Sequence, residues 1–80
     1  VVIPNGVEVI GKQAFEYCGL QSISLPSTLK TINEYAFSGN KLTSLSIPTS
    51  VTFIGRRAFN QNSLPHSEAY IYKRTSSGID

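Results

Sequence analysis

The chain has 80 residues, which limits it to one small domain with a modest hydrophobic core. Hydrophobic residues make up 40% and charged residues 15%, a balance typical of a small soluble fold and not of a disordered chain. No apolar run is long enough for membrane insertion, and the net charge of +2 is too small to indicate a nucleic-acid partner. The single cysteine excludes a disulfide within the chain.

The sequence repeats itself with a period of 22 residues and without insertions. Prolines, alanines, phenylalanines and aliphatic residues recur in register, in the columns Pro4–Pro26–Pro48, Val7–Leu29–Val51, Ile10–Ile32–Ile54, Ala14–Ala36–Ala58, Phe15–Phe37–Phe59 and Leu20–Leu42–Leu64. A fixed period of this length predicts a repeat architecture in which neighbouring units share one core. We expect a repeat domain over residues 1–64, with units 3–24, 25–46 and 47–64, and a C-terminal extension over residues 65–80 that caps the repeats or links them to another domain.

The first ten residues resemble a hairpin that turns at Asn5-Gly6. The matching positions of the later units are Ser27-Thr28 and Thr49-Ser50, which carry no such turn signal. Because the repeat explains all three copies and the hairpin explains only one, we predict no hairpin.

The segment after each proline has apolar residues at helical spacing. Val7, Ile10 and Ala14 are separated by three and four residues, which predicts a short helix or 3₁₀ turn with one inward face. Glycine and asparagine tolerate a positive φ, so a tight corner is expected at the column Gly11–Asn33–Gly55.

Two columns predict close packing between units. The alanines fit a place where neighbouring backbones approach closely, and the phenylalanines are expected to stack at roughly the inter-strand spacing of about 4.8 Å as part of the core, not as a ligand site. In the column Cys18–Asn40–Asn62, we expect a small buried corner where asparagine bonds the backbone and cysteine fills space.

The segments 20–25 and 42–47 alternate apolar and small polar residues, which predicts a half-buried strand that ends at the following proline. With the apolar residues inward, the polar ones form a candidate binding face on the opposite side, made of Gln21, Ser22, Ser24, Thr43, Ser44 and Ser46. These residues are either a hydrogen-bonding strip of the kind that stacked repeats use, or only solvent-compatible strand residues.

No pattern indicates catalysis. The only histidine, His66, is distant in sequence from Cys18, and no ligand spacing for a metal and no phosphate-binding loop is present. We therefore predict no enzyme, no cofactor and no metal site.

The repeated motif resembles the leucine-rich repeat, and in particular its BspA-like subclass. It reads L-x-x-[IL]-x-[LI]-P-x-x-[VL]-x-x-I-[GN]-x-x-A-F, and its clearest copy consists of Leu20, Ile23, Leu25, Pro26, Leu29, Ile32, Asn33, Ala36 and Phe37. The asparagine that usually follows the strand is replaced by Gly6, Thr28 and Ser50, so no asparagine ladder is expected.

The resemblance implies an α/β right-handed solenoid of about three coils, with short parallel strands and short helical turns. It also implies a non-catalytic adhesion module at the cell surface or outside the cell, with a host or matrix protein as partner. The alternative is a carbohydrate- or cell-wall-targeting module of a larger secreted enzyme, with a glycan as partner. Self-association through open solenoid ends is a further possibility for an isolated fragment.

Overall fold

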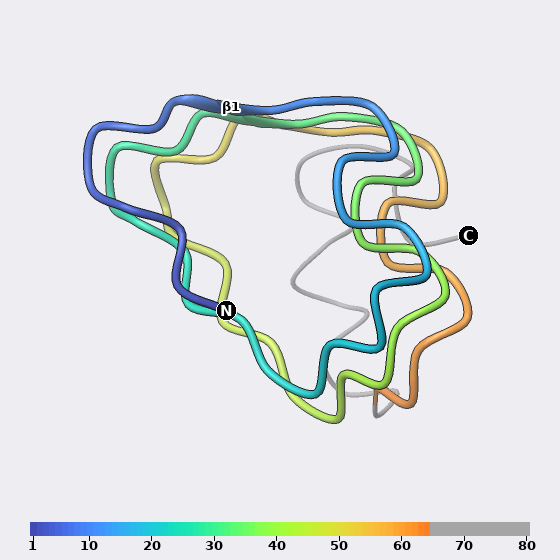
Figure 1. The fold of residues 1–80 in the computed structure, drawn as a ribbon. Helices are drawn as coiled ribbons and strands as arrows, with labels where there is room; N and C mark the ends of the chain where they lie inside the picture. Colours follow the sequence, from blue (N-terminus) through green and yellow to red (C-terminus); the bar gives the residue numbers. More distant parts are fainter. Residues whose placement is uncertain (65–80) are drawn as a thin grey trace.

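The computed structural model describes residues 1–64, in which successive repeat units lie one against the next (Figure 1). Three two-residue strands, β1 (Val9–Ile10), β2 (Thr31–Ile32) and β3 (Phe53–Ile54), form one parallel sheet in the order β1-β2-β3. Their register pairs Val9 with Thr31 and Thr31 with Phe53, which is the sequence period. The predicted parallel pairing with the sequence period is therefore confirmed, but the strands lie outside the predicted segments 20–25 and 42–47. They form where β-branched and aromatic residues share a column.

The helical turn predicted after each proline is wrong. No residue of the described range is helical, and β1 lies inside the segment where the helix was expected. The physical reason is the direction of the backbone N–H groups, since Gln13, Phe15 and Tyr17 donate to carbonyls of the next unit at 3.0, 2.8 and 2.9 Å. A helix requires those donors within its own segment, so the spacing of three and four reflects a sequence of turns around a shared core.

The strand predicted over residues 20–25 is present only as one isolated parallel bridge, Val2 to Ser24, and residues 42–47 contain no strand. Hydrogen bonding at the two ends of each segment explains why no strand forms. At the start, the N–H groups of Leu20 and Leu42 donate to asparagine side chains. At the end, proline has no N–H to give to a ladder. The alternation itself is confirmed, because Leu45 and Ile47 are each 8% exposed.

Positive φ occurs at other columns than the one predicted. Gln13, Tyr35 and Arg57 have φ values of 59°, 59° and 57°, whereas Gly11 and Gly55 lie outside the left-handed region. The glycine at 55 serves a close approach instead, because a Cβ there would stand 2.6 Å from the carbonyl carbon of Asn33. In this column the left-handed backbone conformation is therefore adopted by non-glycine residues.

A β-turn begins at each proline of the repeated column. The N–H groups of Val7, Leu29 and Val51 donate to the proline carbonyls three residues earlier, at 3.3, 3.1 and 3.1 Å. In the first unit the turn contains Asn5-Gly6, but the chain does not return antiparallel, because Val2 and Val9 both pair in parallel with the next unit. The prediction that no hairpin forms is confirmed.

The core runs through all units and is centred on the stacked phenylalanines. The rings of Phe15 and Phe37 stack with centroids 5.3 Å apart, and those of Phe37 and Phe59 with centroids 5.4 Å apart. Phe37 is fully buried, as are Leu29 and Ile32 of the same unit. The predicted phenylalanine stack is confirmed. The C-terminal extension predicted over residues 65–80 lies outside the described residues.

Phe37→Ala is predicted to lower the free energy of unfolding by about 3–5 kcal/mol, because it leaves a cavity between two stacked rings. Chemical denaturation monitored by circular dichroism measures this change. Phe53→Ala is the matched control, since Phe53 is 43% exposed and its loss leaves little void. A Phe37→Ala variant that unfolds like the parent chain would contradict the assigned core.

Candidate binding surface

The polar residues of the candidate binding face are all exposed in the structure. They belong to neighbouring units, with Gln21, Ser22 and Ser24 on the first and Thr43, Ser44 and Ser46 on the second. Between them, Ile23 and Leu25 are half-buried and Leu45 and Ile47 are buried. The structure thus leaves these six side chains, which we call the polar strip, on the solvent side of the segments 21–24 and 43–46.

Asn40 fixes the backbone at the start of the first segment. Its Oδ1 accepts hydrogen bonds from the N–H groups of Cys18 and Leu20, at 3.1 and 2.9 Å. Its Nδ2 donates to the carbonyls of Phe15 and Phe37, both at 2.9 Å. This side chain is only 5% exposed, and it therefore joins two units at the point where the polar strip begins.

Asn62 repeats the arrangement one unit further on. Its Oδ1 accepts from the N–H of Leu42 at 3.0 Å, and its Nδ2 donates to the carbonyls of Phe37 and Phe59 at 2.9 and 3.0 Å. The prediction that asparagine bonds the backbone in the column Cys18–Asn40–Asn62 is therefore confirmed for Asn40 and Asn62. This asparagine ladder lies in the column before the repeated leucine, and not in the column Gly6–Thr28–Ser50, where none was expected.

Cys18 occupies the same column in the first unit but is exposed, so the predicted buried slot is wrong for this residue. Its Sγ donates only to the carbonyl of Glu16, at 3.7 Å. The difference follows from position, because among the described residues no unit lies against the outer face of the first unit.

The spacing of the two segments is set by backbone bonds between units. The N–H of Lys41 donates to the carbonyl of Leu20 at 2.8 Å, and Ser63 donates equivalently to Leu42 at 2.9 Å. The backbone of Ser24 bonds residues about one period earlier, donating to Val1 and accepting from Ile3, both at 2.9 Å. The serine hydroxyls of the strip have no partner among residues 1–64, so each offers a donor and an acceptor to a ligand.

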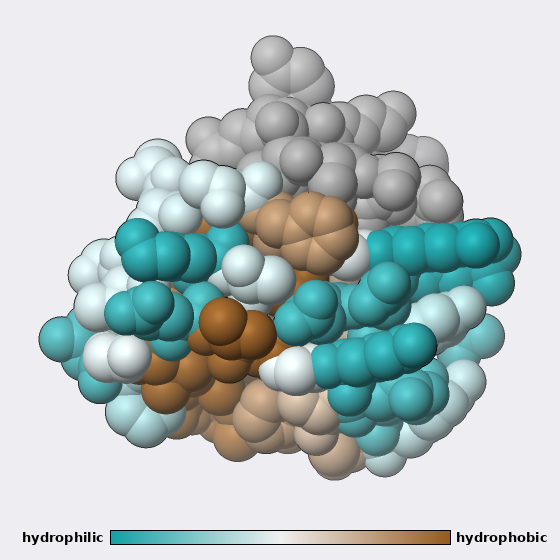
Figure 2. Space-filling model, turned by 90° about the horizontal axis from the view of Figure 1, so that it is seen from above, coloured by the Kyte–Doolittle hydropathy of each residue, from teal (hydrophilic) through white to brown (hydrophobic). Residues whose placement is uncertain are grey.

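A different surface carries the exposed apolar side chains of the sheet. Val9 is 57% and Phe53 43% exposed, on the outer face of β1 and β3. Figure 2 shows this face, with hydrophobic residues in brown between hydrophilic residues in teal. Thr31 separates these two apolar residues in the sheet. Single exposed apolar side chains are common on protein surfaces, so this face defines no site by itself.

Residues 1–64 contain no group of three or more histidine, cysteine or acidic residues placed to hold a metal ion. Within the same range, no helix is long and apolar enough to span a membrane. His66, the only histidine, lies outside the described residues.

Units that add one parallel strand each, share a core of aliphatic residues and phenylalanine, and display polar residues along one side define a parallel repeat protein. The sequence model of the BspA type leucine rich repeat region (6 copies) matches residues 1–75, and the chain belongs to this family. The family is consistent with a surface module that binds proteins. No curated protein and no solved structure gives a significant match to the chain.

Asn40→Ala is predicted to lower the free energy of unfolding by at least about 2 kcal/mol, because it leaves several largely buried backbone groups without partners. Asn60→Ala is the control, since the Asn60 side chain makes no hydrogen bond within the described range. Denaturation of both variants measures the difference. Equal losses would show that the ladder does not hold the units together.

Proposed function

We propose that this chain is a non-catalytic recognition module, a right-handed solenoid that binds a protein at the cell surface through the polar strip. The observation that supports this most is that six polar side chains of neighbouring units are exposed on one side and that the four serine hydroxyls among them have no partner within residues 1–64. The family to which the chain belongs is consistent with protein binding, and its proteins generally lie on the bacterial surface, which supports the localisation.

The chemistry of the polar strip suits an extended segment of a protein partner. Hydroxyl groups at corresponding positions of stacked units repeat at roughly 4.8 Å, the spacing of neighbouring backbones in a sheet. Each hydroxyl can donate to a carbonyl and accept from an N–H of the partner. Serine and threonine also lose little side-chain entropy on binding compared with longer polar residues.

A protein partner is favoured over a glycan by the composition of the strip. Glycan sites commonly stack a sugar ring on an aromatic side chain, and none of the six residues is aromatic. A glycan-targeting role in a larger secreted enzyme is therefore the second outcome of the experiment below, and not a separate proposal. A complete protein interface involves about 20–30 residues on each side, so the polar strip would form part of a larger contact.

The proposal predicts that lysine at four strip positions abolishes binding to the partner. The tested variant changes Ser22, Ser24, Ser44 and Ser46 to lysine, which replaces short hydroxyls by long cations. The chain is screened against immobilised matrix proteins, host surface proteins and cell-wall glycans, and the variant is titrated against every ligand that responds. At least about a tenfold loss of affinity is expected, or 1.4 kcal/mol.

A second variant with the same charge gain provides the control. It carries lysine at four exposed positions outside the strip: Asn5, Ser27, Thr49 and Thr52. This control should bind like the parent chain. Binding to a glycan alone would favour the cell-wall-targeting role. An equal loss of affinity in both variants would mean that the added positive charge causes the loss, and it would contradict the proposed site.

A further inference from the structure

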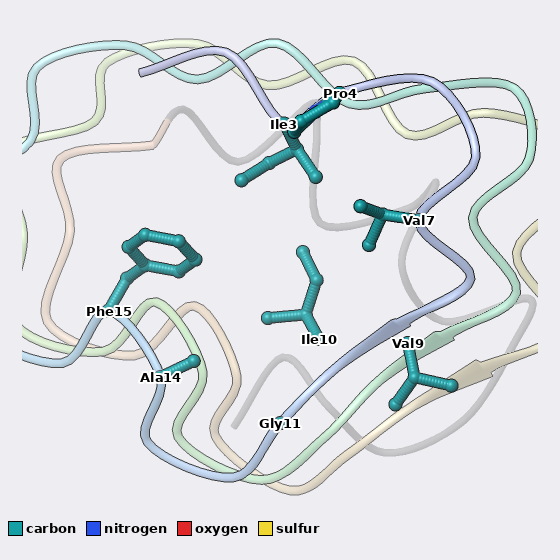
Figure 3. A pocket seen from close by; sticks show the side chains of 8 residues that line it. All are labelled: Ile3, Pro4, Val7, Val9, Ile10, Gly11, Ala14 and Phe15. Carbon is teal, nitrogen blue, oxygen red and sulfur yellow. The ribbon is translucent and has the colours of Figure 1, made fainter.

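The outer side of the sheet carries one side chain from each strand. We call Val9, Thr31 and Phe53 the outer column, because they pair in register from one unit to the next. Val9 points away from the inside of the coil, whereas Ile10, its neighbour in β1, points inward (Figure 3). In Figure 1, β1 lies on a different side of the coil from the segments of the polar strip. The outer column is therefore a separate surface.

Hydrophilic side chains flank the outer column on both sides (Figure 2). In each unit, one flanking position directly precedes the residue of the column, and the other follows it by three residues. These positions form the columns Glu8–Lys30–Thr52 and Lys12–Glu34–Arg56. Each level of the outer column thus has its own pair of flanking residues, and the charge of that pair differs between units.

The charge around the outer column becomes positive toward the third unit. In the first unit, Glu8 and Lys12 flank the column and their charges cancel. In the third unit, Arg56 is followed directly by Arg57, and residues 47–64 contain no acidic residue. An anionic partner is therefore attracted to the third unit and not to the first.

Lys30 adds a further cation beside Phe53. Its backbone carbonyl accepts from the N–H groups of Thr52 and Phe53, at 2.9 and 3.4 Å, and the residue is exposed. The one acidic residue of the second unit is Glu34, so Lys30 and the two arginines leave a local charge of +2. None of these four side chains forms an ion pair within the described part of the chain, so the cations can bind carboxylates of a partner.

Phe53 adds an apolar contact to this positive surface. It is the only aromatic residue of the outer column, and it is 43% exposed. Covering an aromatic ring removes a large apolar area from water. A nucleic acid would use only the charge, and a purely apolar segment would use only the ring. A protein segment that combines carboxylates with an apolar side chain uses both.

We propose that Phe53, Lys30 and Arg56 form a docking site for an acidic segment of a protein partner. An apolar side chain of the segment covers the Phe53 ring, and carboxylates on both sides of it reach the two cations. Arg56 follows Phe53 by three residues, at most about 10 Å of chain, so acidic residues within three positions of the apolar one can reach it. The guanidinium can bind a carboxylate through two parallel hydrogen bonds. The site is independent of the polar strip, so either can fail alone.

A synthetic peptide tests the proposal against the full chain of 80 residues. It contains one tryptophan with two glutamates on each side and a glycine at each end. The chain itself has no tryptophan, so tryptophan emission reports only on the peptide. A saturable shift of the emission to shorter wavelength is expected, with a dissociation constant below about 1 mM. Binding should weaken from about 0.1 M to about 1 M salt, because the Debye length shortens from about 10 to about 3 Å.

The repeat supplies matched controls for variants of the site. Phe53→Ala should weaken peptide binding at least about fivefold, whereas Val9→Ala, in the same column of the first unit, should bind normally. Arg56→Glu should likewise weaken binding at least about fivefold. Its control is Lys12→Glu, which makes the same change of charge in the same column. All four residues are exposed, so the variants should fold, and circular dichroism verifies this.

A second peptide, with glutamine in place of each glutamate, separates charge from apolar contact and is expected not to bind. Equal binding of this peptide would overturn the proposal, as would the absence of an emission shift at a peptide concentration of about 1 mM. Equal losses in Arg56→Glu and Lys12→Glu would assign the binding to net charge alone. Unchanged binding in Phe53→Ala would place the peptide elsewhere on the chain. Either of these results also contradicts the site.

Discussion

The backbone of each unit depends on its neighbours because alternate N–H groups point along the direction of stacking. Over residues 13–17, the N–H groups of Gln13, Phe15 and Tyr17 donate to the next unit, while those of Ala14 and Glu16 close turns within their own unit. A unit alone would leave the first group of donors unpaired, at a cost comparable to several lost hydrogen bonds. Stacking is therefore a condition for the local conformation as well as for the core.

This dependence explains why side chains recur in columns. Once the backbones are bonded in register, equivalent residues lie directly above one another, and a side chain that interacts well with its own kind is favoured at each level. Phenylalanine stacks on phenylalanine in this way, and asparagine bonds the backbone of both its own unit and the unit before. Residues whose side chains take no part in these columns are left to solvent.

The sequence predicted the period and the phenylalanine stack from residue types that recur in register, and the parallel pairing from the resemblance to a repeat family. The sequence wrongly predicted a helical turn after each proline. Apolar residues three and four positions apart can also point inward in a series of turns. The left-handed residues at Gln13, Tyr35 and Arg57 carry no sequence signal, since none of them is a glycine or an asparagine. The exposed strip could be predicted from its alternation, and the backbone bonds of Asn40 and Asn62 from their shared column. That these bonds join two neighbouring units required the structure.

Under the proposed function, stability and recognition draw on different atoms of the same segments. At Ser24 the backbone N–H and carbonyl bond Val1 and Ile3, about one period earlier in the chain, while the hydroxyl has no partner in the described part of the chain. A change of that side chain alters what the surface offers without removing a bond that holds the units together. The buried columns lack this freedom, because Asn40 and Phe37 each contact two neighbouring levels. A scaffold that is fixed by its backbone and inner columns can accordingly carry different ligand chemistries on the polar strip, and variation in binding among such repeats should concentrate there.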